Sequence, residues 1–215
     1  MSPSLLSSRI LARAERASLL IEPAQLELLE RYYLLLERWN EKINLTALPL
    51  AGYADATLVR LIVEPMLAAP HVFPAAGSPA VWIDFGSGGG SPAVPLKIAR
   101  PEFALTMVEA RERKAAFLRE VAGNLGLSAT AVLTGRIEDL AGTEMLGMAG
   151  VVTARAVKID DSLLGAAADV LQPRGRLALF RSAKPPVFND FRFVSIAEAQ
   201  LNPLQASVTI LEKRA

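Results

Sequence analysis

Short apolar segments alternate with helix-length stretches after residue 79, and this alternation is the strongest constraint on the fold. Five of the segments are of strand length: Val81–Phe85, Leu105–Glu109, Thr130–Leu133, Gly150–Ala154 and Arg176–Phe180. The stretches between them are long enough for the crossover helices that join parallel strands. Two later segments, Arg192–Ala197 and Ser207–Glu212, predict an antiparallel hairpin at the sheet edge. The sequence therefore predicts an α/β fold with a mostly parallel sheet and a closing hairpin.

Residues 1–70 show a different pattern, which predicts an N-terminal helical lobe. Between Pro23 and Ile43 the apolar side chains fall on two helical stripes, Leu26, Leu29, Tyr33 and Leu36 on one, and Leu28, Tyr32, Leu35 and Trp39 on the other. Two apolar faces imply that this helix is buried on two sides. A join to the main body, residues 71–215, is expected at a group of helix breakers: Pro70, Pro74, Gly77, Ser78 and Pro79. We expect both parts to form one structural unit.

Composition limits the chemistry that the chain can perform. Its 215 residues include no Cys and a single His, His71, and the 23 Lys and Arg residues nearly balance 22 Asp and Glu residues. The lack of Cys excludes thiol nucleophiles and thiolate zinc sites, and we expect His71 to be a surface or packing residue. A net charge of +1 indicates that any contact with nucleic acid uses a local patch. The most apolar stretch contains Arg60 and Glu64, so no membrane span is expected.

A glycine-rich loop follows the first predicted strand. It reads Asp-Phe-Gly-Ser-Gly-Gly-Gly over residues 84–90 and precedes a helical stretch. Glycine permits a tight turn and a close approach of ligand to backbone, so the loop predicts a cofactor site at the carboxyl end of the sheet. No Lys-Ser/Thr pair follows, which argues against a nucleoside triphosphate. A dinucleotide loop would have Gly86 and Gly88 in place but Ser91 at its third glycine position.

Two carboxylates bear on which cofactor this loop binds. Asp84 would repel the pyrophosphate of a dinucleotide but would attract the ammonium group of a methionine moiety, so its charge favours S-adenosylmethionine. Glu109, at the end of the second predicted strand, is placed to accept hydrogen bonds from ribose hydroxyls in either cofactor. The pair therefore predicts a nucleoside-containing cofactor, with S-adenosylmethionine favoured.

Over most of its length the chain resembles the bacterial 16S rRNA guanine-N7 methyltransferase family, also called the glucose-inhibited division protein B family. The matching segments are Trp39–Thr46, Asp84–Pro92, Gly135–Glu138, Val151–Ala156 and Leu171–Leu177. The resemblance implies a class I methyltransferase sheet, Rossmann-like, that binds S-adenosylmethionine. It places Gly86 and Ser91 at the methionine side, Ile137 and Glu138 at the adenine, and Arg155 at the substrate-facing edge.

The candidate site follows from these observations together. The candidate cofactor residues are Asp84, Gly86, Gly88, Ser91, Glu109, Ile137, Glu138 and Arg155. The candidate catalytic residues are Arg155 and Glu64, which would help to seat the substrate. Guanine N7 carries a lone pair and no proton, so its methylation needs alignment rather than a general base. The scarcity of His is therefore compatible with methylation of guanine N7 in 16S rRNA, the function that we expect.

The chain departs from the family at positions on the substrate side. The family's His-x-Leu-Asp-Ser motif corresponds to Leu61–Pro65, and the Lys after its fifth strand corresponds to Phe180. Two alternatives stay open for this reason: a relative that methylates another RNA or a small molecule, and a non-catalytic protein that binds the cofactor or the ribosome. An oxidoreductase that uses NAD ranks last, because the charge of Asp84 opposes it.

Two groups of basic residues are candidates for contact with 16S rRNA or the small ribosomal subunit. The first consists of Arg174, Arg176, Arg181, Lys184 and Arg192, and the second of Arg111, Arg113, Lys114 and Arg119. Such groups position phosphates, and their binding weakens as salt rises. We expect a cytoplasmic monomer with no metal and no membrane partner.

Overall fold

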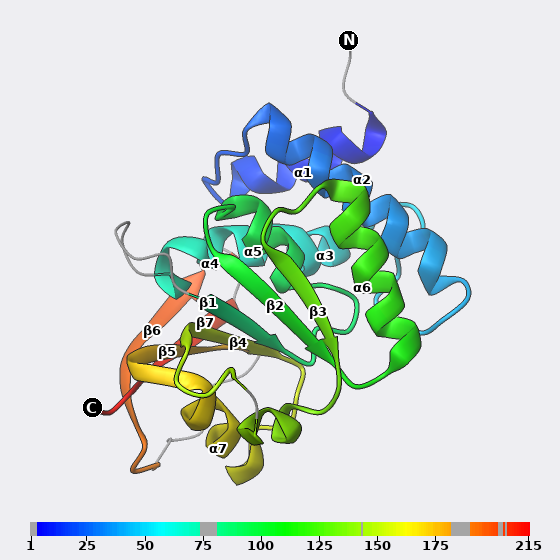
Figure 1. Cartoon of the computed structure of the whole chain (residues 1–215). Helices are drawn as coiled ribbons and strands as arrows, with labels where there is room; N and C mark the ends of the chain where they lie inside the picture. The colour runs from blue at the N-terminus through cyan, green and yellow to red at the C-terminus, as the bar shows by residue number, and fades with distance from the viewer. Residues whose placement is uncertain (1–3, 74–80, 143, 182–189, 202–203, 205) are drawn as a thin grey trace.

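The computed structural model describes residues 4–73, 81–142, 144–181, 190–201, 204 and 206–215. In this described part, seven strands form one sheet in the order β3-β2-β1-β4-β5-β7-β6 (Figure 1). Parallel pairing joins β1 (Val81–Phe85), β2 (Ala104–Glu109), β3 (Thr130–Thr134), β4 (Ala149–Arg155) and β5 (Leu171–Arg181). Antiparallel pairing joins β7 (Ala206–Lys213) to both β5 and β6 (Phe193–Leu201). The α/β fold with a closing hairpin is confirmed.

The fifth strand begins five residues earlier than the sequence predicts. Ala149 pairs with Leu171 and Val151 with Arg176, so the register shifts between these two pairs. Gly175 lies within the irregular segment, where an added Cβ would come within 3.0 Å of the Ala149 carbonyl oxygen. The bulge lets the chain stay in the sheet through a stretch whose Pro and Gly residues argue against a strand.

The lobe consists of α1 (Leu5–Arg16), α2 (Pro23–Asn40), α3 (Asp55–Leu58), a π-helix (Val59–Val63) and α4 (Glu64–Val72). Both stripes of α2 contribute buried side chains: Leu29, Tyr32, Tyr33, Leu35 and Leu36. The predicted burial on two sides is confirmed. Among the described residues no helix combines the length and apolarity that a bilayer span requires.

Two helix ends differ from the prediction. The α2 helix ends at Asn40 rather than at Ile43, because the Asn40 Oδ1 accepts hydrogen bonds from the N–H groups of Leu45 and Thr46, at 2.9 and 3.0 Å. The sequence predicts that Pro70 begins the join, but it lies inside α4. Burial of Val72 and Phe73 keeps this helix against the sheet. The other predicted breakers of the join lie outside the described residues.

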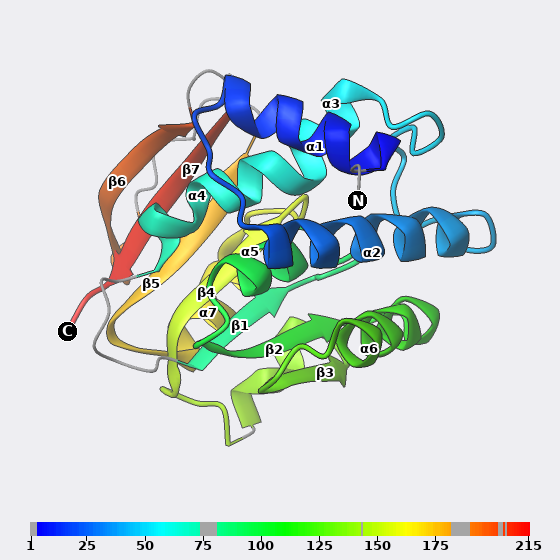
Figure 2. The same ribbon diagram turned by 90° about the horizontal axis from the view of Figure 1, so that it is seen from above.

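Helices cover both faces of the sheet (Figures 1 and 2). The helices α4, α5 (Ala93–Ala99) and α6 (Glu112–Leu125) lie on one face, with α1 and α2 packed outside them. The other face is covered by α7 (Asp161–Val170) and a 3-10 helix (Ile137–Gly142).

Strand residues alternate between two apolar cores because successive side chains point to opposite faces. In β1, Trp82 belongs to the core under the lobe, whereas Ile83 and Phe85 belong to the core under α7. The same alternation points Asp84 toward the lobe. A charged group is therefore set, by its position in the strand, between the sheet and the N-terminal helices.

Candidate functional site

A cavity of about 520 Å³ lies between the lobe and the carboxyl ends of β1, β2 and β4. The lobe lines it with Leu36, Leu45, Thr46, Ala47, Leu48, Arg60 and Leu61, and the main body with Gly86, Ser87, Gly88, Gly89, Ser91, Glu109, Arg111, Lys114, Arg155, Ala156 and Val157. The sheet order reverses between β1 and β4, and ligands of open α/β sheets bind at such a switch point. The volume falls within the range of about 300–1,000 Å³ that small-molecule sites occupy.

The glycine loop forms one wall of the cavity. Gly86 and Gly88 have positive φ values of +66° and +52°, a conformation that favours glycine. A Cβ on Gly86 would lie 2.7 Å from the Val157 Cγ1 atom. The N–H groups of Gly86 and Ser87 both donate to the Val108 carbonyl, at 2.9 and 3.1 Å, so the loop turns back over β2. With the loop held in this way, space for a ligand remains beside Val157 only because residue 86 has no side chain.

Glu109 holds the loop in place from the end of β2. Its Oε2 accepts a hydrogen bond from the Gly88 N–H and its Oε1 accepts one from the Arg111 N–H, both at 2.9 Å. The side chain thus joins the glycine loop to the start of α6. An ionised carboxylate has about four acceptor positions, so the two hydrogen bonds leave capacity for ribose hydroxyls.

The lobe contacts the same loop from the other side. The hydroxyl of Tyr32 on α2 donates to the Gly89 carbonyl oxygen at 2.7 Å. Gly89 also faces the lobe closely, because an added Cβ there would lie 3.2 Å from the Leu45 carbonyl oxygen. The loop is therefore positioned jointly by the sheet and by the N-terminal helices.

Asp84 lies buried beneath the loop rather than in the cavity wall. Its Oδ1 accepts a hydrogen bond from Thr153, whose hydroxyl oxygen accepts one from the Trp82 Nε1 at 2.9 Å. Its Oδ2 is buried and has no partner among the described residues. Burial raises the pKa of Asp84 to about 6, against the opposing effects of the Ser87 and Thr153 hydroxyls and the Arg155 charge. A cation close to Oδ2 would stabilise the ionised carboxylate.

Glu64 and two arginines form a charged cluster between lobe and sheet. The Arg155 Nη2 lies 2.6 Å from the Glu64 Oε1, and the Arg60 Nη1 donates to both Glu64 oxygens at 3.0 Å. Glu64 is only 1% exposed and does not line the cavity. Burial lowers the pKa of Arg155 to about 10, and the Glu64 charge opposes this effect. The Arg155 guanidinium also lies over the ring of Phe180, 4.8 Å from its centre.

The π-helix explains how Arg155 and Ser91 dock on the lobe. Pro65 has no N–H, so it donates neither to the Leu61 carbonyl, four residues before it, nor to the Arg60 carbonyl, five residues before it. The Ser91 hydroxyl donates to the first at 2.9 Å, and the Arg155 Nη1 donates to the second at 2.7 Å. The Ser91 hydroxyl of the glycine-loop region and Arg155 at the end of β4 thus donate to two carbonyls to which Pro65 cannot donate.

The structure brings together five of the residues predicted from sequence. Gly86, Gly88, Ser91, Glu109 and Arg155 line one cavity, with Asp84 below its loop and Glu64 behind its wall. The pair predicted for adenine lies apart from the lining residues. Ile137 packs against the core under α7, and Glu138 accepts a hydrogen bond from Ser162 at 3.3 Å. Their assignment to adenine stays a prediction.

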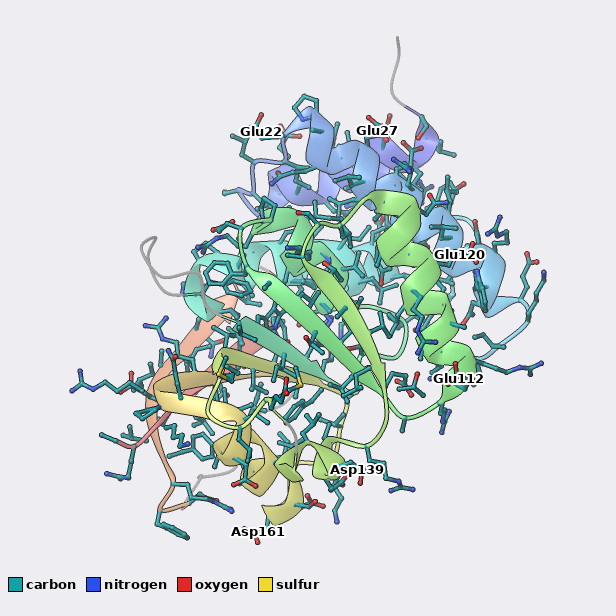
Figure 3. The ribbon with its side chains drawn as sticks, viewed as in Figure 1. Glu22, Glu27, Glu112, Glu120, Asp139 and Asp161 are labelled. Atoms are coloured by element: carbon teal, nitrogen blue, oxygen red, sulfur yellow. The ribbon has the colours of Figure 1, made fainter. Side chains whose placement is uncertain are left out.

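Sequence reasoning missed the wall that the lobe supplies. Leu45 to Leu48, Arg60 and Leu61 line the cavity, although none was a candidate site residue. The resemblance drew attention to the Asn-Leu-Thr segment, and the hydrogen bonds of Asn40 show what it does: they fold this segment over the cavity. Trp39 instead packs against α6, where its Nε1 donates to Glu120 at 3.1 Å; Glu120 is labelled in Figure 3.

The second predicted basic group divides into three kinds of residue. Arg111 and Lys114 line the cavity, and no hydrogen bond or ion pair of their side chains occurs among the described residues. Arg113 is exposed on the helix surface. Arg119 forms an ion pair of 3.0 Å with Glu112, the first residue of α6, which is labelled in Figure 3. Two members of the group therefore remain available to an anion in the cavity.

The first predicted basic group lies elsewhere. Arg174 and Arg176 lie in the early part of β5, toward the sheet edge opposite the cavity. Arg192 pairs with Asp190 at 2.6 Å and with Asp161 at 2.5 Å. Lys184 and the side chain of Arg181 lie outside the described residues. The described members of this group do not line the cavity.

Solved structures support the assignment of the sheet to the class I methyltransferase fold. An S-adenosylmethionine-dependent methyltransferase from Aquifex aeolicus matches 73% of this chain and 92% of its own, with a TM-score of 0.54 at 13% identity. A putative methyltransferase from Escherichia coli matches 69% of this chain and 80% of its own, with a TM-score of 0.52 at 13% identity. At such identities the similarity concerns the fold alone.

Sequence relatives are more specific. A family model described as rRNA small subunit methyltransferase G matches residues 25–186. Ribosomal RNA small subunit methyltransferase G of Cupriavidus necator is 34% identical over 184 residues, which cover 82% of this chain and 76% of that protein. The protein of the same name from Neisseria gonorrhoeae is 34% identical over 164 residues, covering 76% of this chain and 73% of its own length. The chain therefore belongs to the rRNA small subunit methyltransferase G family.

Proposed function

We propose that this protein transfers a methyl group from S-adenosylmethionine to N7 of a guanine in 16S rRNA, and that it works in the cytoplasm, where this RNA is found. The observation that carries the proposal is the glycine loop, held by Glu109 at the switch point of the sheet in a chain of this family. Relatives named for methylation of small-subunit rRNA supply the substrate class.

The residues present fit S-adenosylmethionine. Gly86 and Gly88 provide a wall without side chains, and Glu109 retains acceptor capacity for ribose hydroxyls. The unpartnered Oδ2 of Asp84 provides a negative charge beneath the loop, which suits a cofactor that carries an ammonium group and a sulfonium. When bound, the cofactor supplies an electrophilic methyl group.

The protein's own contribution is alignment and exclusion of water. The N7 lone pair of guanine attacks without loss of a proton, so no side chain has to act as a base. This agrees with the position of His71, which is exposed on α4 and does not line the cavity. Leu36, Leu45 and Leu61 form an apolar wall that limits solvent at the reacting atoms. Alignment of reactants lowers barriers by up to about 7–11 kcal/mol in model systems.

Calorimetry with S-adenosylmethionine and S-adenosylhomocysteine tests the cofactor. We expect saturable binding of both, and a lack of binding heat with either would rule out a methyltransferase role. A Gly86→Val variant should lose binding, because its side chain would meet Val157. Gly123→Ala is the matched control, since nothing lies within 4 Å of an added Cβ at that exposed helical position.

Depletion of the protein in its host tests the target. Mapping of N7-methylguanosine in 16S rRNA by mass spectrometry should show the loss of one modified position, restored by the unaltered gene and not by the Gly86→Val variant. Unchanged 16S rRNA methylation in cells that lack the protein would reject this target. If cofactor binding were intact in that case, a different RNA or a small molecule would become the favoured substrate.

A further inference from the structure

Arg60 presents a free guanidinium edge at the cavity. Its Nη1 donates to both carboxylate oxygens of Glu64, whereas its Nε and Nη2 make no hydrogen bond among the described residues. Both nitrogen atoms are accessible to solvent, since neither is among the buried polar atoms without a partner, and the side chain is 27% exposed. Nε–H and Nη2–H form the fork with which arginine binds planar or tetrahedral anions through two parallel hydrogen bonds.

Arg155 differs from Arg60 in this respect. Its Nη1 donates to the Arg60 carbonyl and the Ser91 hydroxyl, its Nη2 donates to Glu64, and its side chain is only 7% exposed. The Arg155 Nε has no partner among the described residues but is buried, so Arg155 presents little accessible donor capacity to a substrate, although it ends β4 at the ligand-binding edge. Instead, Arg155 donates to the backbone carbonyl of Arg60 and to one oxygen of Glu64, the carboxylate to which Arg60 also donates.

We propose that Arg60 is the arginine that binds substrate, through a backbone phosphate of the RNA beside the target guanosine, and that Glu64 and Arg155 position it. The proposal rests on the proposed function and goes further by assigning roles within the charged cluster. A residue held at its Nη1 by a buried carboxylate keeps its fork in one orientation, and such preorganisation reduces the entropy lost on binding.

The ligand class follows from the charges around the cavity. Arg60, Arg111 and Lys114 line it, whereas Glu109, the one carboxylate among the described lining residues, already accepts two backbone hydrogen bonds. Such a wall suits an anion with two acceptor oxygens on one group. A phosphate provides this, whereas a two-pronged contact with guanine O6 and N7 would occupy the lone pair that has to receive the methyl group.

Binding of unmethylated 16S rRNA transcript, measured by filter binding with S-adenosylhomocysteine present over 50–200 mM KCl, tests the proposal. Arg60→Gln should weaken RNA binding about tenfold, as expected when a charge-assisted contact is lost. It should also flatten the slope of log K against log salt by about 0.7, the value for one phosphate contact on a single strand. Arg60→Lys should keep the slope because it keeps the charge.

Two controls accompany these variants. Arg16→Gln removes the same charge from the exposed end of α1, away from the residues that line the cavity and outside both candidate basic groups, and should leave the slope unchanged. Affinity for S-adenosylhomocysteine, measured by calorimetry, should stay within about twofold in all variants, under ~0.5 kcal/mol. A merely structural role for Arg60 would lower the unfolding midpoint without changing the salt slope.

The following results would overturn the proposal: an unchanged slope for Arg60→Gln, an equal loss for Arg16→Gln, parallel loss of cofactor affinity, or no RNA binding by the unaltered protein. Failure of the proposed function is distinguishable, because it appears as absent methyl transfer by a protein that still binds RNA through Arg60.

Discussion

The replacement Asp84→Asn tests whether a buried charge is kept beneath the glycine loop at a cost in stability. The amide preserves the acceptor that Thr153 uses, and its nitrogen takes the place of the Oδ2 atom that has no partner among the described residues. The substitution therefore removes the charge while keeping the shape and the hydrogen bond from Thr153. Its effect on stability should depend on pH.

The magnitude follows from the pKa of Asp84, which burial raises from 3.8 to about 6. Between these pH values the unfolded chain releases the proton and the folded protein keeps it, so stability falls as pH rises. Each pH unit corresponds to about 1.4 kcal/mol, so the folded protein loses about 3 kcal/mol by pH 7. The amide of the variant cannot ionise, so the variant should lack this decline, whatever constant cost its unpartnered nitrogen adds.

Urea denaturation at several pH values from 4 to 8 measures the effect. The free energy of unfolding of Asp84→Asn minus that of the unaltered protein should increase by about 2–2.5 kcal/mol across this range, because part of the total loss already occurs below pH 4. Cofactor affinity, from calorimetry at pH 8, should fall at least about tenfold because the negative charge is lost. Parallel stability curves, with a difference constant within about 0.5 kcal/mol, would refute the burial of an ionisable carboxylate at this site.

Two further substitutions test the loop. Gly86→Ala should destabilise the protein by about 2–4 kcal/mol, of which about 1–2 comes from the positive φ and the rest from the contact with Val157. In the same thermal unfolding assay, Gly123→Ala should be neutral or stabilising. Equal effects of the two substitutions would contradict the tight packing of the loop at Gly86. Tyr32→Phe should cost about 1 kcal/mol and weaken cofactor binding severalfold. Tyr33→Phe loses a hydrogen bond of the same length, 2.7 Å, that the Tyr33 hydroxyl donates to the Leu50 carbonyl and not to the glycine loop, so its cofactor affinity should not change. An equal loss of affinity in both variants would argue against a role of the lobe in holding the loop.

The sheet could be predicted because its signals are local. Apolar runs bounded by turn residues indicated all seven strands, and alternation within β1 separates Trp82 from Ile83 and Phe85. The two errors at helix ends arose where a tertiary contact or a side-chain hydrogen bond overrode the local preference. Pro70 stays helical because α4 packs on the sheet, and α2 stops at Asn40 because that side chain accepts two hydrogen bonds from the following turn.

The sequence alone predicts only those site residues that lie at the ends of recognisable strands. Gly86 and Glu109 follow strand ends, which meet at one edge of a parallel sheet. Arg60 lies in a π-helix that precedes Pro65, and the carbonyls of this helix are bound by Ser91 and Arg155, which are distant in sequence. No local pattern indicates that Arg155 is engaged internally while Arg60 is open to the cavity.

Methyl transfer by the purified protein tests the central claim most directly. Unmethylated 16S rRNA, free or in small subunits, is incubated with S-adenosylmethionine, digested to nucleosides and analysed by mass spectrometry. We predict one N7-methylguanosine per 16S rRNA, formed by the unaltered protein and strongly reduced in the Asp84→Asn variant. A product methylated at another atom, or no methylated nucleoside from a protein that binds the cofactor, would contradict the account.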